Sequence, residues 1–172
     1  MDATGALLLQ IVVTVLLPLW MAAGLGDWWC HRIQRIEATT GWPESALHLA
    51  MLSEIGIGVL AAALFEPTAG LVLALLVLCV VHEVTMFVDL SYAEARRRIP
   101  PVEQWVHSVQ HAMPWVAWAA WALAQHGRLL PTGLVLRAEP LPGGVWPLLA
   151  LGGGLIGTAF MQEALRCWRA AR

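Results

Sequence analysis

Four segments of the sequence pair a carboxylate with an imidazole at spacings of four or seven residues. In chain order the pairs are Asp27 with His31, Glu44 with His48, His82 with Asp89, and Glu103 with His107 and His111. These spacings return a helical side chain to nearly the same face, so each segment predicts a helix with a polar stripe. Imidazole and carboxylate are the ligands of zinc and of non-haem iron or manganese. The chemistry that these segments indicate is metal chemistry.

The rest of the composition is that of a membrane protein. Of the 172 residues, 59% are hydrophobic and 13% are charged, whereas soluble domains carry about 25% charged residues. The net charge of −2 offers no basic surface, so no nucleic-acid partner is expected. The three cysteines form no CxxC motif and predict neither a disulfide framework nor a zinc ribbon.

The elements that must position the polar stripes are transmembrane helices. A bilayer is crossed by about 20 apolar residues, and such runs predict one transmembrane domain over residues 1–172, with spans near 3–26, 43–65, 67–90, 101–124 and 145–165. The predicted fold class is therefore an all-α integral membrane protein of about five helices. The fourth run is the least regular, because its start is amphipathic and Pro114 lies inside it. Gly152 and its neighbouring glycines indicate close helix packing in the fifth.

The arginines predict the orientation. With five spans, two arginines fall on the side of the N-terminus and eight on the opposite side, namely Arg32, Arg35, Arg96, Arg97, Arg98, Arg166, Arg169 and Arg172. Cationic excess marks the cytoplasmic side. We therefore expect a bacterial inner (plasma) membrane protein with its N-terminus outside.

Alternating topology brings all four stripes to the cytoplasmic end of the bundle. Four helices that each supply carboxylate or imidazole are the plan of di-iron bundles. Nine ligands exceed one tetrahedral zinc and match two metal ions, so the predicted ligands or their hydrogen-bonding supports are His31, His48, His82, His107, His111, Glu44, Glu103, Asp27 and Asp89. Glu54, deeper in the second span, is a candidate proton carrier or ligand support.

The remaining acids have simpler interpretations. Glu37, Glu83, Glu94 and Glu163 are expected to be solvated, to cap helices or to pair with arginine. For two predicted ligands an arginine partner is the competing interpretation: Arg32 or Arg35 for Asp27, and Arg96 for Asp89.

The HxxxH pattern at His107 and His111 resembles one element of the histidine-motif membrane desaturases and hydroxylases. Those enzymes place histidine boxes at the cytoplasmic ends of their spans and bind two irons. The resemblance covers the plan of the site, because HxxHH boxes are absent and carboxylates replace many of the expected histidines. It implies a di-iron oxidoreductase that uses O2 to desaturate or hydroxylate a membrane lipid or an apolar small molecule. The chain has no flavin or nucleotide motif, so electrons are expected from an external ferredoxin or reductase.

Three other functions are open at this stage, and one of them is a metal-free scaffold or assembly subunit. A membrane zinc hydrolase of a lipid amide or ester would use Glu44 or Glu103 as the base for a zinc-bound water. A haem b electron-transfer module would use two histidines as axial ligands, but it leaves the carboxylates without a role. The Arg96–Arg98 run fits orientation, an acidic redox partner or anionic lipid.

Overall fold

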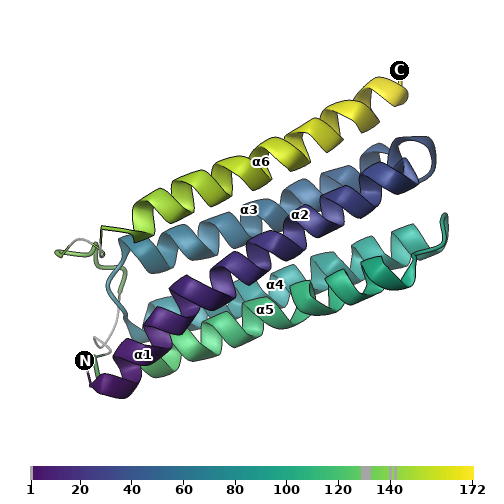
Figure 1. The fold of residues 1–172 in the computed structure, drawn as a ribbon. Helices are drawn as coiled ribbons and strands as arrows, with labels where there is room; N and C mark the ends of the chain where they lie inside the picture. The colour runs from purple at the N-terminus through teal and green to yellow at the C-terminus, as the bar shows by residue number, and fades with distance from the viewer. Residues whose placement is uncertain (1, 129–132, 140, 142) are drawn as a thin grey trace.

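The computed structural model describes residues 2–128, 133–139, 141 and 143–172. Five long helical segments run alternately up and down, side by side (Figure 1). They are α1 (Ala3–Ile11), η1 (Val12–Leu16) and α2 (Leu17–Gln34) in continuous succession, then α3 (Trp42–Leu64), α4 (Ala69–Glu94), α5 (Pro101–Gln125) and α6 (Val145–Ala170). In the described ranges the only β pairing is an isolated bridge between Phe65 and Leu136. The predicted all-helical class is confirmed.

The helices extend beyond the predicted spans at the arginine-rich end. The first ends at Gln34 instead of residue 26, α4 at Glu94 instead of 90, and α6 at Ala170 instead of 165. Charged residues end the stretch that suits lipid, but they do not end the backbone hydrogen bonding of a helix. α2 stops where Arg35 adopts the left-handed conformation, with φ 55°.

Two prolines lie inside long helices without ending them. Pro18 cannot donate a hydrogen bond to the carbonyl of Thr14, and its ring crowds that turn. The π-helical turn η1 immediately precedes it and widens the helix there. α5 continues through Pro114 as a single helix.

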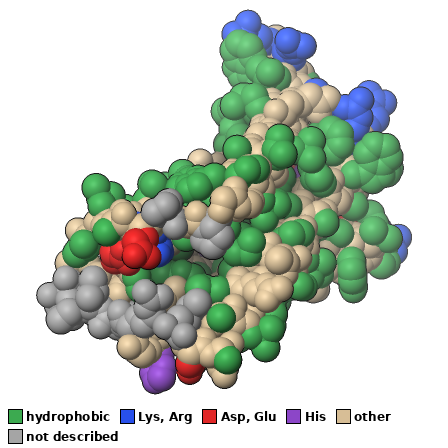
Figure 2. Space-filling view, turned by 60° about the vertical axis from the view of Figure 1, so that its left-hand side comes forward, with side chains coloured by type: hydrophobic (Ala, Val, Ile, Leu, Met, Phe, Trp, Pro, Cys, Tyr) green, Lys and Arg blue, Asp and Glu red, His purple; other side chains and the backbone are tan. Residues whose placement is uncertain are grey.

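The bundle buries a cluster of polar side chains within an otherwise apolar core, and its exterior is apolar. The largest fully buried side chains include His31, His48, Glu44, Glu103 and Glu163. Hydrophobic side chains cover the flanks, and the arginines, in blue, gather mainly at one end (Figure 2). Among the described residues, four helices are long and apolar enough to cross a membrane. The α5 segment is not among them, because its first half carries polar residues, of which Glu103 and His107 are buried.

Contacts between helices place their polar ends together. α3 packs against α4 and α6, while α2 packs against α5 and α6. The expected close packing at glycine occurs at Gly152, where an added Cβ would collide with Sδ of Met21. At Gly153, Gly154 and Gly157 an added Cβ would meet nothing within 4 Å, so the other glycines of α6 do not serve this packing.

Candidate metal centre

The first group of side chains surrounds His31 at the arginine-rich end of α2. His31 Nε2 lies 3.3 Å from Asp27 Oδ1, 3.2 Å from Glu103 Oε1 and 3.9 Å from Glu44 Oε1. His107 Nε2 lies 3.0 Å from the same Asp27 oxygen and 4.0 Å from Glu103 Oε1. An imidazole nitrogen carries at most one proton, and among the described residues Nε2 of His31 hydrogen-bonds to Glu103, while Asp27 and Glu44 approach it without a hydrogen bond.

These separations suit a metal ion. Ligands held about 2.0–2.1 Å from a tetrahedral ion are roughly 3.3 Å from one another. One ligand atom each from Asp27, His31, Glu103 and His107 all lie within 4.8 Å of one another, and all four residues are buried. This group brings together four of the nine predicted ligands, from α2 and α5.

The second group surrounds His48 of α3. Its Nε2 lies 3.4 Å from Oδ1 of Asp89 in α4. Both atoms are buried, and neither has a hydrogen-bond partner among the described residues. Buried polar atoms without partners are rare and costly, and a cation between them would satisfy both. Glu44 and His31 supply ligand atoms within 4.8 Å of one in His48, so the donor set fits a second ion.

Glu163 of α6 joins the two groups. Its Oε2 lies 3.1 Å from Nδ1 of His31, and its Oε1 lies 2.7 Å from Nδ1 of His48. The sequence interpretation of Glu163 as solvated, capping or paired with arginine is wrong, because the side chain is fully buried between the two imidazoles. A carboxylate on Nδ1 fixes the proton there and leaves Nε2 free to bind metal. The fifth helix therefore also contributes to the site.

Arg97, in the connection between α4 and α5, closes the outer side of the site. Its Nη2 donates to Oε1 of Glu44 at 2.6 Å and to Oε1 of Glu103 at 2.5 Å, while Nη1 donates to Oε2 of Glu103 at 3.0 Å. Gln34 bonds to both Arg97 and Glu103. Burial alone would lower the pKa of Arg97, but hydrogen bonds to Glu103 and Glu44 raise it above its usual value. The guanidinium is therefore a permanent cation that ties the start of α3 to the start of α5.

The arginine run has two different environments. Arg97 has a side chain only 4% exposed, so its interpretation as a surface anchor or docking residue is wrong. Arg96 and Arg98 are exposed, and Arg96 lies over the ring of Tyr92 at 3.7 Å. No local feature of the sequence marks this difference, because all three residues are identical neighbours and only the turn after α4 directs one inward.

Two predicted ligands lie outside both groups. His82 Nδ1 lies 3.0 Å from Glu54 Oε2, and Thr85 donates to the other Glu54 oxygen at 2.7 Å. His111 Nδ1 lies 2.8 Å from Oε1 of Glu83. His82 and His111 both line a cavity that residues of the two groups around His31 and His48 also line. We call these two groups the metal groups. Each of these two histidines is thus an imidazole held by a carboxylate, and neither belongs to the candidate ligand groups of the described residues.

The structure decides the competing pairings of the acids. Asp27 bonds to His107 and contacts His31, and Asp89 contacts His48, so the arginine pairings considered for these two acids do not form. Glu37 does pair with an arginine, accepting from Arg166 at 2.5 Å. Glu83 instead accepts from Trp115 as well as contacting His111.

The buried carboxylates of the site outnumber the arginines that bond to them. Five buried carboxylates converge here: Asp27, Glu44, Asp89, Glu103 and Glu163. Of the arginines that the structure describes, only Arg97 bonds to them. Buried charges must be compensated, and when the imidazoles are neutral, as they are when they bind metal, four negative charges remain. Two divalent ions supply the same amount of positive charge.

Family models, characterised proteins and solved structures give no match to this chain. The geometry of the site therefore carries the functional argument.

Proposed function

We propose that this chain is an integral membrane oxidoreductase that holds two iron ions and uses O2 to hydroxylate or desaturate a lipid-like substrate. The observation that carries the proposal is the pairing of His31 and His48 on Glu163. Their rings are parallel within 6°, with centroids 4.5 Å apart. Two-metal sites place their ions about 3.5–4 Å apart, so two such imidazoles suit neighbouring ions.

Mixed histidine and carboxylate ligation favours iron. This ligand set with open positions is typical of non-haem iron that reacts with O2. Bis-histidine haem needs the imidazoles on opposite faces of a macrocycle, whereas His31 and His48 are stacked on each other. Asp27, His31, Glu103 and His107 would hold one ion, and His48, Asp89 and Glu44 the other.

Beside the four helices that are long and apolar enough to cross a membrane, we expect α5 to cross it as well. α5 would be the remaining span, because its polar residues Glu103 and His107 are buried while Val102, Trp105 and Leu123 on its outer side are more than half exposed. Ionisable residues in a membrane face the bundle interior in this way. The excess of arginine at the end nearest the site would put the site at the cytoplasmic face of a bacterial inner membrane.

The reaction needs reductant. Iron held by these residues would supply the chemistry of O2 activation and C–H cleavage. In hydroxylation, one O2, two electrons and two protons convert C–H into C–OH and release one water. In desaturation the same inputs remove two hydrogens from adjacent carbons and release two waters. An external ferredoxin or reductase would supply the electrons, and the exposed Arg96 and Arg98 offer it a cationic surface.

The chain's own residues would handle protons and exclude water. Glu54 has a side chain 15% exposed and contacts His82, which lines the cavity. This pair could pass protons from the outer side of α3 toward the cavity. Burial of the carboxylates and the closure by Arg97 would keep bulk water away from the ions.

Metal analysis with Mössbauer spectroscopy of protein from iron-57-replete cells tests the proposal. We expect about two irons per chain and a coupled di-iron signal. Stoichiometric zinc without iron, together with no substrate-dependent O2 consumption, would support the hydrolase alternative. Protein that binds no metal in vivo or on reconstitution would overturn both.

A further inference from the structure

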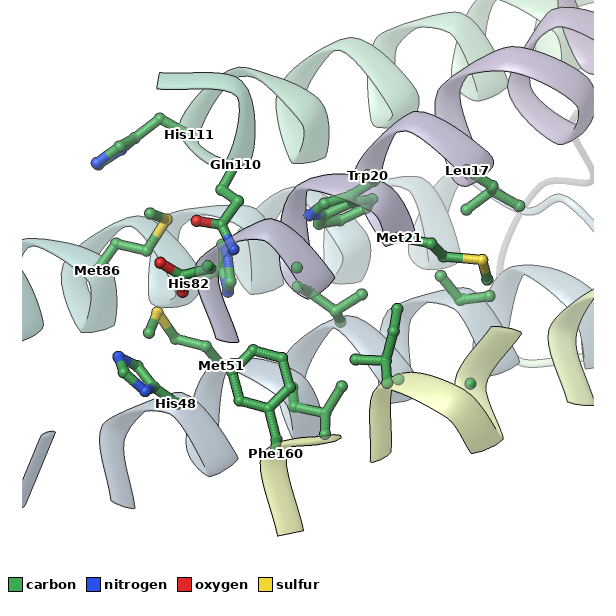
Figure 3. A pocket seen from close by; sticks show the side chains of 18 of the residues that line it. Leu17, Trp20, Met21, His48, Met51, His82, Met86, Gln110, His111 and Phe160 are labelled. Carbon is green, nitrogen blue, oxygen red and sulfur yellow. The ribbon is translucent and has the colours of Figure 1, made fainter. Parts of the chain in front are cut away.

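A cavity of about 260 Å³ extends from the metal groups toward the other end of the bundle. It runs from His48 and His111 at one end to Leu17 and Met21 at the other (Figure 3). Asp27, His48, Asp89 and His107 all line it. Any molecule in the cavity would therefore reach both candidate ions directly.

Beyond the metal groups the wall of the cavity is apolar. α2, α3 and α6 supply side chains such as Leu17, Ile55, Val59 and Ile156. An occupant gains free energy there by burying hydrocarbon, and it finds few hydrogen-bond partners. The unpartnered Nε2 of His48 and Oδ1 of Asp89 lie at the opposite, polar end. The cavity is thus built for a long apolar body with its reacting part at the metals.

Two glycines widen the apolar part. Gly56 of α3 and Gly153 of α6 both line the cavity, and a Cβ added to either would meet nothing within 4 Å. Leu60, another lining residue, is 48% exposed, and Gly153 is exposed. The cavity therefore reaches the outer surface of the bundle at Leu60 and Gly153, in the part of α3 and α6 that is most apolar.

We infer that this cavity binds one unbranched hydrocarbon chain, taken in between α3 and α6, and that Gly56 and Gly153 set the chain length. The inference deepens the proposed function and rests on it for the reaction, but binding itself requires no metal. From Leu17 to Asp27 the rise of α2 is roughly 15 Å, the length of an extended chain of about twelve carbons. The cavity volume accommodates one hydrocarbon chain, so the proposed ligand is a single-chain amphiphile.

Binding of tritiated dodecanol tests the inference, with the full chain in a steroid-based detergent that has no alkyl chain of its own. Unlabelled straight-chain alcohols from hexanol to hexadecanol serve as competitors. We calculate the affinity of the protein for each alcohol from the concentration of alcohol free in water. This affinity should rise with the length of the alcohol up to about twelve carbons and then level off. Gly153→Leu should weaken dodecanol binding by about tenfold and make the affinity level off at a shorter alcohol, because it fills open space in the wall.

Gly154→Leu is the matched control. Gly154 is the next residue of the same helix, does not line the cavity, and also has open space for a Cβ, so dodecanol binding should not change. Gly56→Leu repeats the test from α3 if the first variant folds poorly. Equal effects of Gly153→Leu and Gly154→Leu, or affinity that does not depend on length, would overturn the inference.

Iron content of the same preparations separates this inference from the proposed function. Two irons per chain with dodecanol binding insensitive to Gly153→Leu would overturn the hydrocarbon site alone. A length limit that moves in Gly153→Leu, in protein unable to bind iron, would support the hydrocarbon site and overturn the di-iron proposal.

Discussion

The imidazole rings of His31 and His48 lie face to face, 4.5 Å apart and parallel within 6°. They come from α2 and α3, and one Glu163 carboxylate from α6 contacts Nδ1 of each. Three helices are thus held in register by two contacts. The arrangement directs both Nε2 atoms toward the remaining carboxylates, which is the geometry that supports a dinuclear centre.

Glu163→Gln should reduce metal affinity by about 10–100-fold, as is usual when the hydrogen-bond partner of a metal-binding histidine is lost. The amide cannot accept from both Nδ1 atoms, because only one of its two polar ends is an acceptor. Titration of apo protein with Fe²⁺ or Co²⁺ under anaerobic conditions measures the change. Glu94→Gln, at an exposed position of α4, is the control and should bind normally.

Asp89→Asn should lower metal stoichiometry from two ions to one. Asp89 contacts His48 and lies outside the group of four around His31, so the first ion should remain. His107→Gln should remove the other ion in turn. Loss of both ions in each variant would show that the two positions are not separable, and retention of both in Asp89→Asn would contradict its role as a ligand.

His82→Gln and His111→Gln should keep both ions. Their Nδ1 atoms contact Glu54 and Glu83, and neither histidine belongs to a metal-sized group in the described residues. Elemental analysis of each variant checks this, with His107→Gln as the variant that should lose metal. Loss of an ion from either would restore these histidines as ligands, as the spacing in the sequence predicts.

Arg97→Gln should destabilise the metal-free protein by about 3–5 kcal/mol, because it leaves Glu44 and Glu103 buried without their cation. Added metal should recover part of that loss, since it supplies positive charge to the same carboxylates. Thermal unfolding in detergent, with and without metal, measures both effects. The exposed neighbour is the control, and Arg98→Gln should change stability by less than about 0.5 kcal/mol.

The pH dependence of Arg97 has a defined sign. Its pKa is raised in the folded protein, so its contribution to stability is complete below the ordinary arginine pKa and is lost only when pH rises through the folded value. Between neutral pH and about pH 10, the stability difference between Arg97→Gln and the unchanged protein should therefore stay constant. A difference that shrinks over this interval would contradict a permanently charged guanidinium.

The positions of the helices, and the side chains that share a helix face, could be predicted well from the sequence. The positions of all five long helices and the polar stripes of Asp27 with His31 and Glu103 with His107 follow from local periodicity and from the length of apolar runs. Alternating direction then places the stripes at one end. These properties depend on residues near each other in the chain, so the sequence alone determines them.

The membership of the site was decided by tertiary structure. Spacing says that His107 and His111 share a face, but the rotation of α5 against α2 and α4 sends one to Asp27 and the other to Glu83. Glu163 has no histidine at helical spacing, so no stripe marked it, although a lone acid in an apolar span is costly enough to suggest a buried partner.

Arg97, in the connection between α4 and α5, is another residue whose contacts could not be predicted from the sequence. Its neighbours in the sequence are arginines too, and only the turn from α4 into α5 brings its side chain onto Glu44 and Glu103. Local sequence determines which side chains a helix can present together. How helices rotate and how a turn directs one side chain depend on packing between distant segments, and that packing assembles the candidate metal centre.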